Sequence, residues 1–290
     1  MTADFERGAA IARDAERIAA LALAEDGPRD ITSDVTVAPH MEAVGRIEYR
    51  SGGVVAGRAY ADAVARAAHC AITWQAEDGQ SVARGTTIGL LTGPLAQVLR
   101  AERPLLNLLQ RACGIASTTR TFVAAVTGTR TRILHTRKTA PGLRGLDIAA
   151  VLAGGGCEHR RDLAETVMVK DNHWQALAAQ GKSLRAALDE ARALGVTGLQ
   201  VEVETVEQLR DACAAGATRL LVDNQSPETL ECWATHARDL APGIEIEATG
   251  GITLDNVRAY ALAGADFISI GALTHSVRAA DLALEIERRG

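Results

Sequence analysis

The chain has 290 residues, 47% hydrophobic and 3% aromatic, enough to form one large domain or two smaller ones around a sizeable core. Its 31 basic and 36 acidic residues give a formal charge of −5, which argues against nucleic-acid binding through a broad basic face. A small anionic ligand held in a focused cleft fits this charge balance better.

Cysteine usage and hydropathy narrow the class of protein further. The five cysteines form no CxxC pair, which argues against a disulfide framework or a zinc site. Cys157 lies in a candidate site loop, but an incidental cysteine is a commoner finding than a catalytic thiol. The first eight residues carry no apolar signal region, and no run approaches the ~20 apolar residues of a membrane span. We therefore expect a cytoplasmic protein.

The first part of the chain predicts a mixed α/β region. Residues 6–24 have helical spacing of apolar residues among alanines. Residues 43–57 and 72–99 contain short β-branched and aromatic runs separated by Gly-rich turns, which indicates a small β-rich section. Residues 100–127 return to a helical pattern with an apolar band of leucines at positions 105, 106, 108 and 109.

From about residue 130 the pattern becomes regular, with short apolar runs that are usually followed by helical stretches. The runs are Arg132–Leu134, Val167–Val169, Leu199–Val203, Leu220–Val222, Ile244–Ala248 and Phe267–Ile270. Such βα units predict a parallel sheet, most simply a closed or nearly closed barrel, whose active site lies at the carboxyl ends of the strands. Residues 277–288 are expected to form a terminal amphipathic helix.

Cationic side chains cluster after the first two of these runs. Arg137 and Lys138 follow the first run, on a turn that closes at Pro141-Gly142 before a helix expected from about Leu143. Similar loops occur at residues 154–161 and 168–173, which completes a set of five: Arg137, Lys138, His159, Arg160 and Lys170. Any one of them could be a surface cation. Because all follow strand ends or Gly-rich turns, the set indicates a pocket for a strongly negative ligand.

Acidic residues lie at the ends of the next two runs. Alternation in Gln200–Glu204 places Glu202 and Glu204 on one face, which would be the barrel interior, although a half-exposed edge strand is the alternative. Asp223 ends the following run in the same manner. Inward carboxylates beside cationic loops can bind a metal or stabilise a cationic, sugar-like transition state.

The last two runs end in glycine-containing loops, Thr249–Ile252 and Ser269–His275. Glycines let backbone N–H groups approach a ligand, and late βα loops often bind phosphate in barrels. Asp171 or Asn172 could also cap the helix expected over Trp174–Leu194.

Taken together, the chain resembles quinolinate phosphoribosyltransferase over about residues 20–285. The resemblance rests on segments in matching order and spacing: Glu25–Ser33, Glu102–Asn107, Thr136–Thr139, His159-Arg160, Lys170–His173, Val201–Glu204, Asp223-Asn224, Gly250-Gly251 and Gly271–His275. It implies an α/β fold with an N-terminal α/β sandwich, residues 1–115, and a C-terminal open, TIM-like α/β barrel, residues 116–275. A helix over 276–290 would pack back on the sandwich.

The resemblance also implies roles for individual residues. Arg103, reaching in from the second subunit of a homodimer or an assembly of dimers, would join Arg137, His159, Arg160 and Lys170 around the carboxylates of quinolinate. Lys138 would lie near phosphoribosyl pyrophosphate, and Glu202 and Asp223 would face its ribose and a Mg²⁺ ion bound mostly through substrate and water. Thr249, Gly250, Gly251, Gly271 and His275 would hold the 5′-phosphate. Lys138, Lys170, Glu202 and Asp223 would be the catalytic set.

Three positions depart from the family pattern. His135 stands where the family usually has Asp, Glu158 where it usually has Asn, and Thr249 where it usually has Ser. Glu158 adds a negative charge beside the proposed carboxylate-binding pair, and His135 removes a carboxylate. Both changes bear on the preference for an acceptor.

Three alternatives stay open at this point. One is the pyrophosphorylase-like paralogue associated with molybdate transport genes, which would act on a different acceptor. Another is a barrel aldolase that uses Lys138 or Lys170 as a Schiff-base amine. The third is a non-catalytic phosphosugar-binding protein, which would have no need for Glu202 and Asp223.

Overall fold

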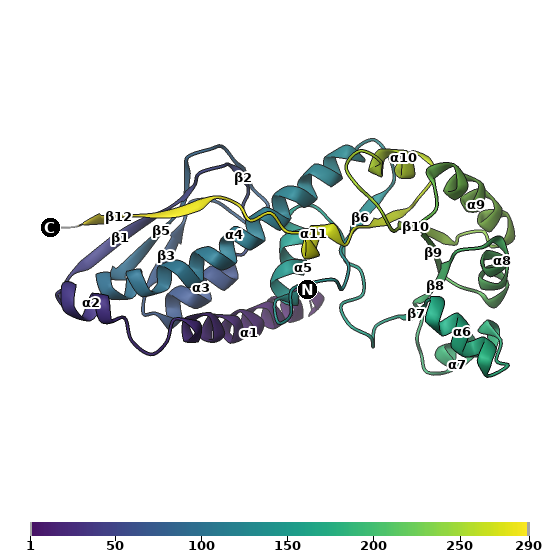
Figure 1. Ribbon diagram of the computed structural model, residues 1–290, viewed down its shortest axis with the longest axis horizontal. Helices are drawn as coiled ribbons and strands as arrows, with labels where there is room; N and C mark the ends of the chain where they lie inside the picture. The colour runs from purple at the N-terminus through teal and green to yellow at the C-terminus, as the bar shows by residue number, and fades with distance from the viewer. Residues whose placement is uncertain (1, 289–290) are drawn as a thin grey trace. The chain divides into compact units, whose positions relative to one another are not determined.

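The computed structural model describes residues 2–288, with side chains from residue 8 to 287, and the chain divides into two compact units (Figure 1). Unit 1 takes in the chain up to Arg120, Lys138–Gly155 and the segment from Ala272 onward; unit 2 takes in Thr121–Arg137 and Gly156–Gly271. The division therefore differs from the continuous one expected from the sequence, because a loop and helix after residue 137 return to unit 1.

Unit 1 contains the predicted long helices and the β-rich section. Its elements are α1 (Thr2–Glu25), α2 (Ile31–Thr36), β1 (Glu42–Tyr49), β2 (Gly53–Val54), α3 (Arg58–Ala67), β3 (Ala71–Trp74), β4 (Ser81–Val82), β5 (Thr86–Pro94), α4 (Leu95–Ala125, of which the last five residues belong to unit 2), α5 (Arg144–Ala153), α11 (Ala272–His275) and β12 (Leu282–Arg288). The four leucines of the α4 band are all buried, which confirms that prediction. The β-rich section ends earlier than expected, because α4 begins at Leu95.

Four strands of unit 1 form an antiparallel sheet in the order β12-β1-β5-β3. Burial alternates along β1, where Ala43, Ile47 and Tyr49 face the core and Arg46 faces solvent. This period of two is what a sheet with one covered face requires. The helix α1 packs against α3 and contacts α5.

The C-terminal segment is a strand, so the expected helix over residues 276–290 is wrong within the described range. Apolar residues alternate at Leu282, Leu284 and Ile286, and β12 pairs with β1 along its whole length (Figure 1). Without this partner, β1 would expose an unpaired edge. The segment is also tied to α4, since the Gln110 amide donates to the backbone oxygen of Leu282 at 2.9 Å.

Unit 2 contains the six predicted βα strands in one parallel sheet. Its elements are β6 (Arg132–Leu134), β7 (Val167–Val169), α6 (Asp171–Ala179), α7 (Leu184–Ala193), β8 (Leu199–Val203), α8 (Val206–Ala215), β9 (Arg219–Asp223), α9 (Pro227–Leu240), β10 (Glu245–Thr249), α10 (Val257–Leu262) and β11 (Phe267–Ser269). The strand order is β6-β11-β10-β9-β8-β7. Among the described residues β6 and β7 do not pair, so the barrel is open, as expected.

Two local predictions in unit 2 need correction. The single helix expected over residues 174–194 is broken into α6 and α7, because Gly181 adopts a positive φ of 62° and the Ser183 hydroxyl caps a new helix. Neither Asp171 nor Asn172 caps α6. The helix already includes Asp171, and the backbone N–H of Lys170 donates to Nδ1 of His173 at 3.0 Å.

Within residues 2–288, none of the helices combines the length and the apolar character that crossing a bilayer demands.

Candidate active site

His135 follows β6 and is completely buried. Its Nε2 accepts a hydrogen bond from the backbone N–H of His159 at 2.9 Å, which requires an unprotonated nitrogen. Burial lowers the pKa of His135 to about 4, so the ring is neutral near pH 7. The side chain thus supports the backbone of the neighbouring loop, and does so without the charge of the Asp that the family usually has.

His159 is also nearly buried, with its side chain 6% exposed. Its Nδ1 accepts from the backbone N–H of Arg160 at 2.8 Å, and its Nε2 lies 3.2 Å from a carboxylate oxygen of Glu247. Both ring nitrogens therefore have protein partners.

Glu247, on β10, is a residue of this site that the sequence analysis missed. It is 1% exposed and accepts from Arg219 at 3.1 Å as well as from His159. Burial works to raise the pKa of Glu247, but the hydrogen bond and charge of His159 and the charge of Arg219 outweigh it and lower the pKa. The signal was available, because alternation in Glu245–Thr249 places Glu247 on the same face as Thr249.

Lys170 and Glu202 form an ion pair between the end of β7 and β8. Glu202 is buried, on one rung of the sheet with Leu221 of β9 and Glu247 of β10. The Nε1–H of Trp174 donates to the backbone oxygen of Glu202 at 2.9 Å and ties α6 to this strand. All of β8 is buried, which excludes the half-exposed edge strand.

Glu204 does not share this environment, contrary to expectation. It lies beyond the end of β8 and is exposed. Its backbone N–H donates to Oε1 of Gln208 at 2.7 Å, because the chain has already turned toward the N-terminus of α8, which Thr205 caps.

Arg137 and Arg160 concentrate positive charge at the carboxyl end of the sheet. Burial, followed by the charge of Arg137, lowers the pKa of Arg160, so the two guanidinium groups interact unfavourably. The Nε of Arg137 is buried and has no hydrogen-bond partner among the described residues. A buried unpaired donor beside a second cation favours an anion at this position.

Asp223, Thr249 and Gly250 come together at the ends of β9 and β10. Asp223 and Thr249 are register partners, and the Asn224 amide donates to Asp223 at 2.6 Å. Gly250 has a φ of 82°, and a Cβ there would lie 2.2 Å from Oδ1 of Asn224, so only glycine fits. Gly251 also has a positive φ, of 60°, but open space around it. Gly271 follows β11.

Three predicted site residues belong to unit 1: Arg103, Lys138 and His275. The loop of Lys138 is held at two points. The Thr274 hydroxyl donates to the backbone oxygen of Lys138 at 2.8 Å, and the backbone N–H of Ala140 donates to the buried Asp147 at 3.1 Å. Asp147 accepts both 2.7 Å hydrogen bonds of the Arg111 fork. His275 itself is exposed, with Nδ1 2.6 Å from the Ser276 hydroxyl.

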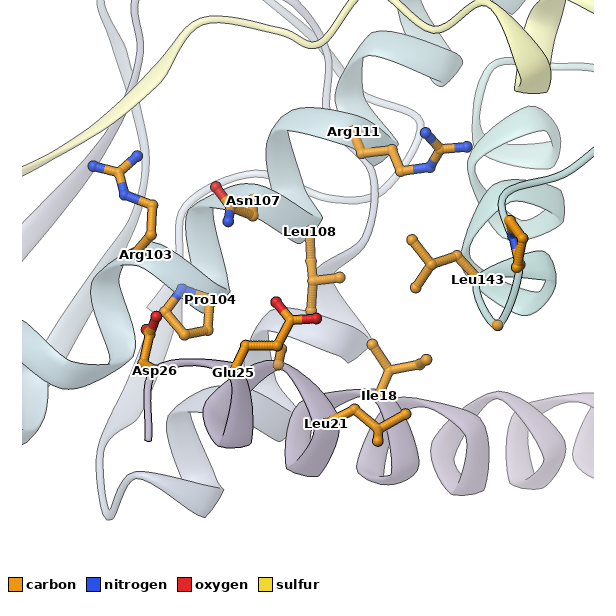
Figure 2. Close-up of a pocket in the computed structure, with 13 residues that line it drawn as sticks. Ile18, Leu21, Glu25, Asp26, Arg103, Pro104, Asn107, Leu108, Arg111 and Leu143 are labelled. Atoms are coloured by element: carbon orange, nitrogen blue, oxygen red, sulfur yellow. The ribbon is translucent and has the colours of Figure 1, made fainter. Parts of the chain in front are cut away.

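Arg103 extends from α4 at the edge of a pocket of about 310 Å³ within unit 1 (Figure 2). Its side chain is 61% exposed and has only a loose contact, 3.7 Å, with Glu102. The pocket is lined by α1, α4 and the Pro141–Leu143 loop, and Glu25, Asn107 and Arg111 supply further polar groups.

Comparison with known proteins matches both parts of the chain to one family. Residues 30–113 match the quinolinate phosphoribosyl transferase N-terminal domain, and residues 115–285 match the C-terminal domain. The chain is 43% identical over 212 residues (72% of this chain, 71% of the relative) to the probable carboxylating nicotinate-nucleotide pyrophosphorylase of Bacillus subtilis. It is 37% identical over 262 residues (89% and 91%) to the corresponding Mycobacterium leprae protein.

Solved structures agree with the sequence comparison. The nicotinate-nucleotide pyrophosphorylase from Francisella tularensis superimposes with a TM-score of 0.88 at 31% identity, over 95% of this chain and 97% of the other. Since the two family models together span residues 30–285 and leave out only residue 114, this chain belongs to the quinolinate phosphoribosyl transferase family.

Proposed function

We propose that this protein transfers the phosphoribosyl group of phosphoribosyl pyrophosphate to the nitrogen of quinolinate and releases pyrophosphate and CO₂, which leaves nicotinate mononucleotide. The relatives are named as carboxylating nicotinate-nucleotide pyrophosphorylases, which favours this reaction over that of the molybdate-associated paralogue. The observation that carries the proposal is the pair of neighbouring guanidinium groups, Arg137 and Arg160, with the buried Nε of Arg137 unpaired within the described chain.

A planar dianion suits this pair. Quinolinate carries two adjacent carboxylates, and arginine forks bind carboxylates in the plane of the guanidinium group. Lys170 at the rim of the site and Arg103 from a second subunit would complete the neutralisation of the two carboxylates, with His159 beside them. The acceptor would then lie with its ring nitrogen toward the donor.

The donor would lie along the ends of the later strands. Lys138 would neutralise the pyrophosphate, while Thr249, Gly250, Gly251, Gly271 and His275 would bind the 5′-phosphate through backbone N–H groups and the imidazole. Glu202 and Asp223 would face the ribose. In this arrangement the protein holds two anions together that repel each other in solution.

Glu202 and Asp223 also fit a Mg²⁺ ion held mainly by substrate and water. No cluster of three or more acidic, His or Cys side chains suitable for a metal occurs among the side chains described, residues 8–287. Mg²⁺ commonly keeps several waters and uses one or two carboxylates plus substrate phosphates. When bound, the ion would neutralise charge on the pyrophosphate.

The proposed reaction has three steps: cleavage of the ribose–pyrophosphate bond, formation of the bond to the pyridine nitrogen, and loss of CO₂. The bond from ribose C1 to the pyrophosphate oxygen breaks with its electron pair on the leaving group, and the positive charge that develops on the ribose is stabilised by Glu202 and Asp223. The lone pair of the pyridine nitrogen forms the new bond to C1. The resulting pyridinium accepts the electron pair released when the C2 carboxylate leaves as CO₂, and a proton from solvent then restores C2–H.

The assembly and location belong to the same proposal. Arg103 is supplied across a homodimer or an assembly of dimers, and the protein acts in the cytoplasm. The exposed, weakly attached Arg103 side chain supports a role outside its own unit.

The proposal is tested by incubating the protein with quinolinate, phosphoribosyl pyrophosphate and Mg²⁺ while nicotinate mononucleotide and CO₂ are followed together. We expect both products in equal amounts, and neither when nicotinate replaces quinolinate. No turnover, with phosphoribosyl pyrophosphate still bound, would point to a different acceptor. His135→Asp and Glu158→Asn would then be the first substitutions to make.

A further inference from the structure

A buried ion pair in unit 1 lies next to the Lys138 loop, residues 138–143. Arg111 of α4 donates both 2.7 Å hydrogen bonds of its fork to Asp147 of α5, whose side chain is completely buried. Nη2 of Arg111 also donates to the backbone oxygen of Thr274 in α11 at 3.0 Å. One guanidinium group of α4 therefore binds α5 and α11 at once.

The two partners of Arg111 hold the Lys138 loop from both sides. Asp147 accepts a hydrogen bond from the backbone N–H of Ala140 at 3.1 Å. The Thr274 hydroxyl donates to the backbone oxygen of Lys138 at 2.8 Å. Because both partners also bind Arg111, these contacts form a closed ring of hydrogen bonds in which Arg111 is the shared member.

The segment after α11 is fixed on the same part of α4. The backbone N–H of Ala280 donates to the backbone oxygen of Gln110 at 2.9 Å. One turn further along α4, Gly114 has no room for a Cβ, because the backbone oxygen of Arg278 would lie 2.2 Å from it. This stretch of α4 therefore holds α11, which ends at His275.

Direct binding of an anion is the alternative role for Arg111, because Arg111 lines the pocket at whose edge Arg103 lies. Figure 2 shows the guanidinium group of Arg111 pointing away from Arg103. Arginine binds anions best through a fork of two N–H groups. The fork of Nε and Nη2 is occupied by Asp147, and the remaining hydrogen of Nη2 is donated to Thr274, so Nη1 cannot form a second fork with it.

We infer that Arg111 is a positioning residue for the phosphoribosyl donor, which acts by fixing the Lys138 loop and α11 in one arrangement. The inference rests on the proposed function, which assigns Lys138 to the pyrophosphate and His275 to the 5′-phosphate. Cations that are already in place lose little freedom when an anion binds, so a fixed loop binds the donor more tightly than a mobile loop of the same charge.

Two substitutions of Thr274 test the ring without breaking the ion pair. Thr274→Val keeps the shape of the side chain but removes the hydroxyl that holds the Lys138 loop. We expect its KM for phosphoribosyl pyrophosphate to rise about fivefold. Its KM for quinolinate should stay within about twofold of wild type, because Arg137 is not a member of the ring. Thr274→Ser keeps the hydroxyl and should retain the wild-type KM for the donor. A wild-type KM in Thr274→Val, or an equal rise in both variants, would overturn the inference.

A double variant removes the ion pair and leaves no unpaired buried charge. Arg111→Met alone would leave the buried Asp147 without its cation, which strongly destabilises a protein. Arg111→Met combined with Asp147→Leu replaces the pair by apolar groups, so the fold should be retained. We expect the KM for phosphoribosyl pyrophosphate to rise about tenfold. Hydrogen–deuterium exchange of the Lys138 loop, followed by mass spectrometry, should become faster because the Ala140 N–H loses its buried acceptor.

Arg120→Met is the matched control for the double variant. Arg120 also lies in α4, and its guanidinium group binds the backbone oxygens of Gly79, Ala153 and Gly154, at the other end of α5. Its substitution should lower the free energy of unfolding but leave the donor KM and the exchange of the Lys138 loop unchanged. A rise in donor KM equal to that of the double variant would show that a general loosening of unit 1 governs donor binding, which contradicts the role of the ring.

The two proposals fail in different ways. Wild-type protein that does not use quinolinate contradicts the proposed function, while hydrogen exchange and calorimetric titration with phosphoribosyl pyrophosphate alone still test the role of Arg111. Unchanged exchange and unchanged donor affinity in the folded double variant contradict that role, whichever acceptor the protein uses. If the double variant does not fold, the comparison of Thr274→Val with Thr274→Ser decides.

Discussion

His135 couples the stability of this protein to pH. Burial lowers its pKa to about 4 from an unfolded value of 6.5, so between these two pH values the unfolded chain binds more protons than the folded one. The contribution of His135 to the free energy of unfolding is fully present above about pH 6.5. It is lost as the pH falls toward 4, which lowers the free energy of unfolding by up to roughly 3 kcal/mol. His135→Gln keeps an acceptor but cannot titrate, and should flatten this part of the profile. The check is urea denaturation at pH 4.5, 5.5 and 7; parallel profiles for the two proteins would contradict the assignment.

Arg137 is the residue on which acceptor binding depends most. Arg137→Ala should weaken quinolinate binding by about 3 kcal/mol, roughly a hundredfold, because one carboxylate loses a forked, charged partner. Arg137→Lys keeps the charge without the fork, so its affinity for quinolinate should lie between those of wild type and Arg137→Ala. Calorimetric titration gives the affinities, and circular dichroism confirms folding.

Arg161 offers a matched control for that experiment. It is a cation of the loop between α5 and β7 that also carries Arg160, but its side chain pairs with Glu158. Arg161→Ala should therefore bind quinolinate as wild type does. Equal losses in Arg161→Ala and Arg137→Ala would show that the net positive charge of the two loops, and not a specific fork, governs binding.

At the scale of the elements, α4 and the C-terminal segment approach each other closely at Gly114. A Cβ at Gly114 would lie 2.2 Å from the backbone oxygen of Arg278, so Gly114→Ala must push the two segments apart. We expect a net loss of about 1–3 kcal/mol in the free energy of unfolding, although alanine is the better helix former.

Gly8→Ala is the control for Gly114→Ala. Gly8 also lies within a helix, α1, but nothing approaches the position of its Cβ within 4 Å. Its substitution should therefore be neutral or stabilising by up to about 1 kcal/mol. Urea denaturation of both variants measures the difference; a neutral Gly114→Ala would mean that the segment before β12 moves aside at no cost.

At the scale of the whole molecule, a shared active site predicts complementation between subunits. Arg103→Ala and Lys170→Ala should each be inactive. After random subunit exchange about half of the dimers are mixed and each has one intact site, so activity should return to about a quarter of wild type. The assay is quinolinate turnover before and after exchange, with exchange followed by native mass spectrometry.

Arg137→Ala mixed with Lys170→Ala is the control for this experiment. Both residues belong to unit 2, so a mixed dimer has a defect in each of its sites and should stay inactive. Recovery in this control, or none in the first mixture despite proven exchange, would count against sharing of Arg103.

Local patterns in the sequence determined much of this molecule. The period of apolar residues in α4 and the six βα runs predicted helix and parallel sheet, because burial on one face imposes that period on any sequence. Strand ends carrying Arg137, Lys170, Glu202 and Asp223 predicted a site at the carboxyl edge of the sheet, since parallel strands bring their carboxyl ends together.

Other features were decided only by tertiary structure. Residues 282–288 become a strand because β1 offers an edge, and a short apolar run cannot by itself choose between helix and strand. Glu247 belongs to the site because β10 brings it into contact with His159, a residue 88 positions away in the chain. Burial and hydrogen-bond partners depend on such distant contacts, so they follow from the fold and not from neighbouring residues.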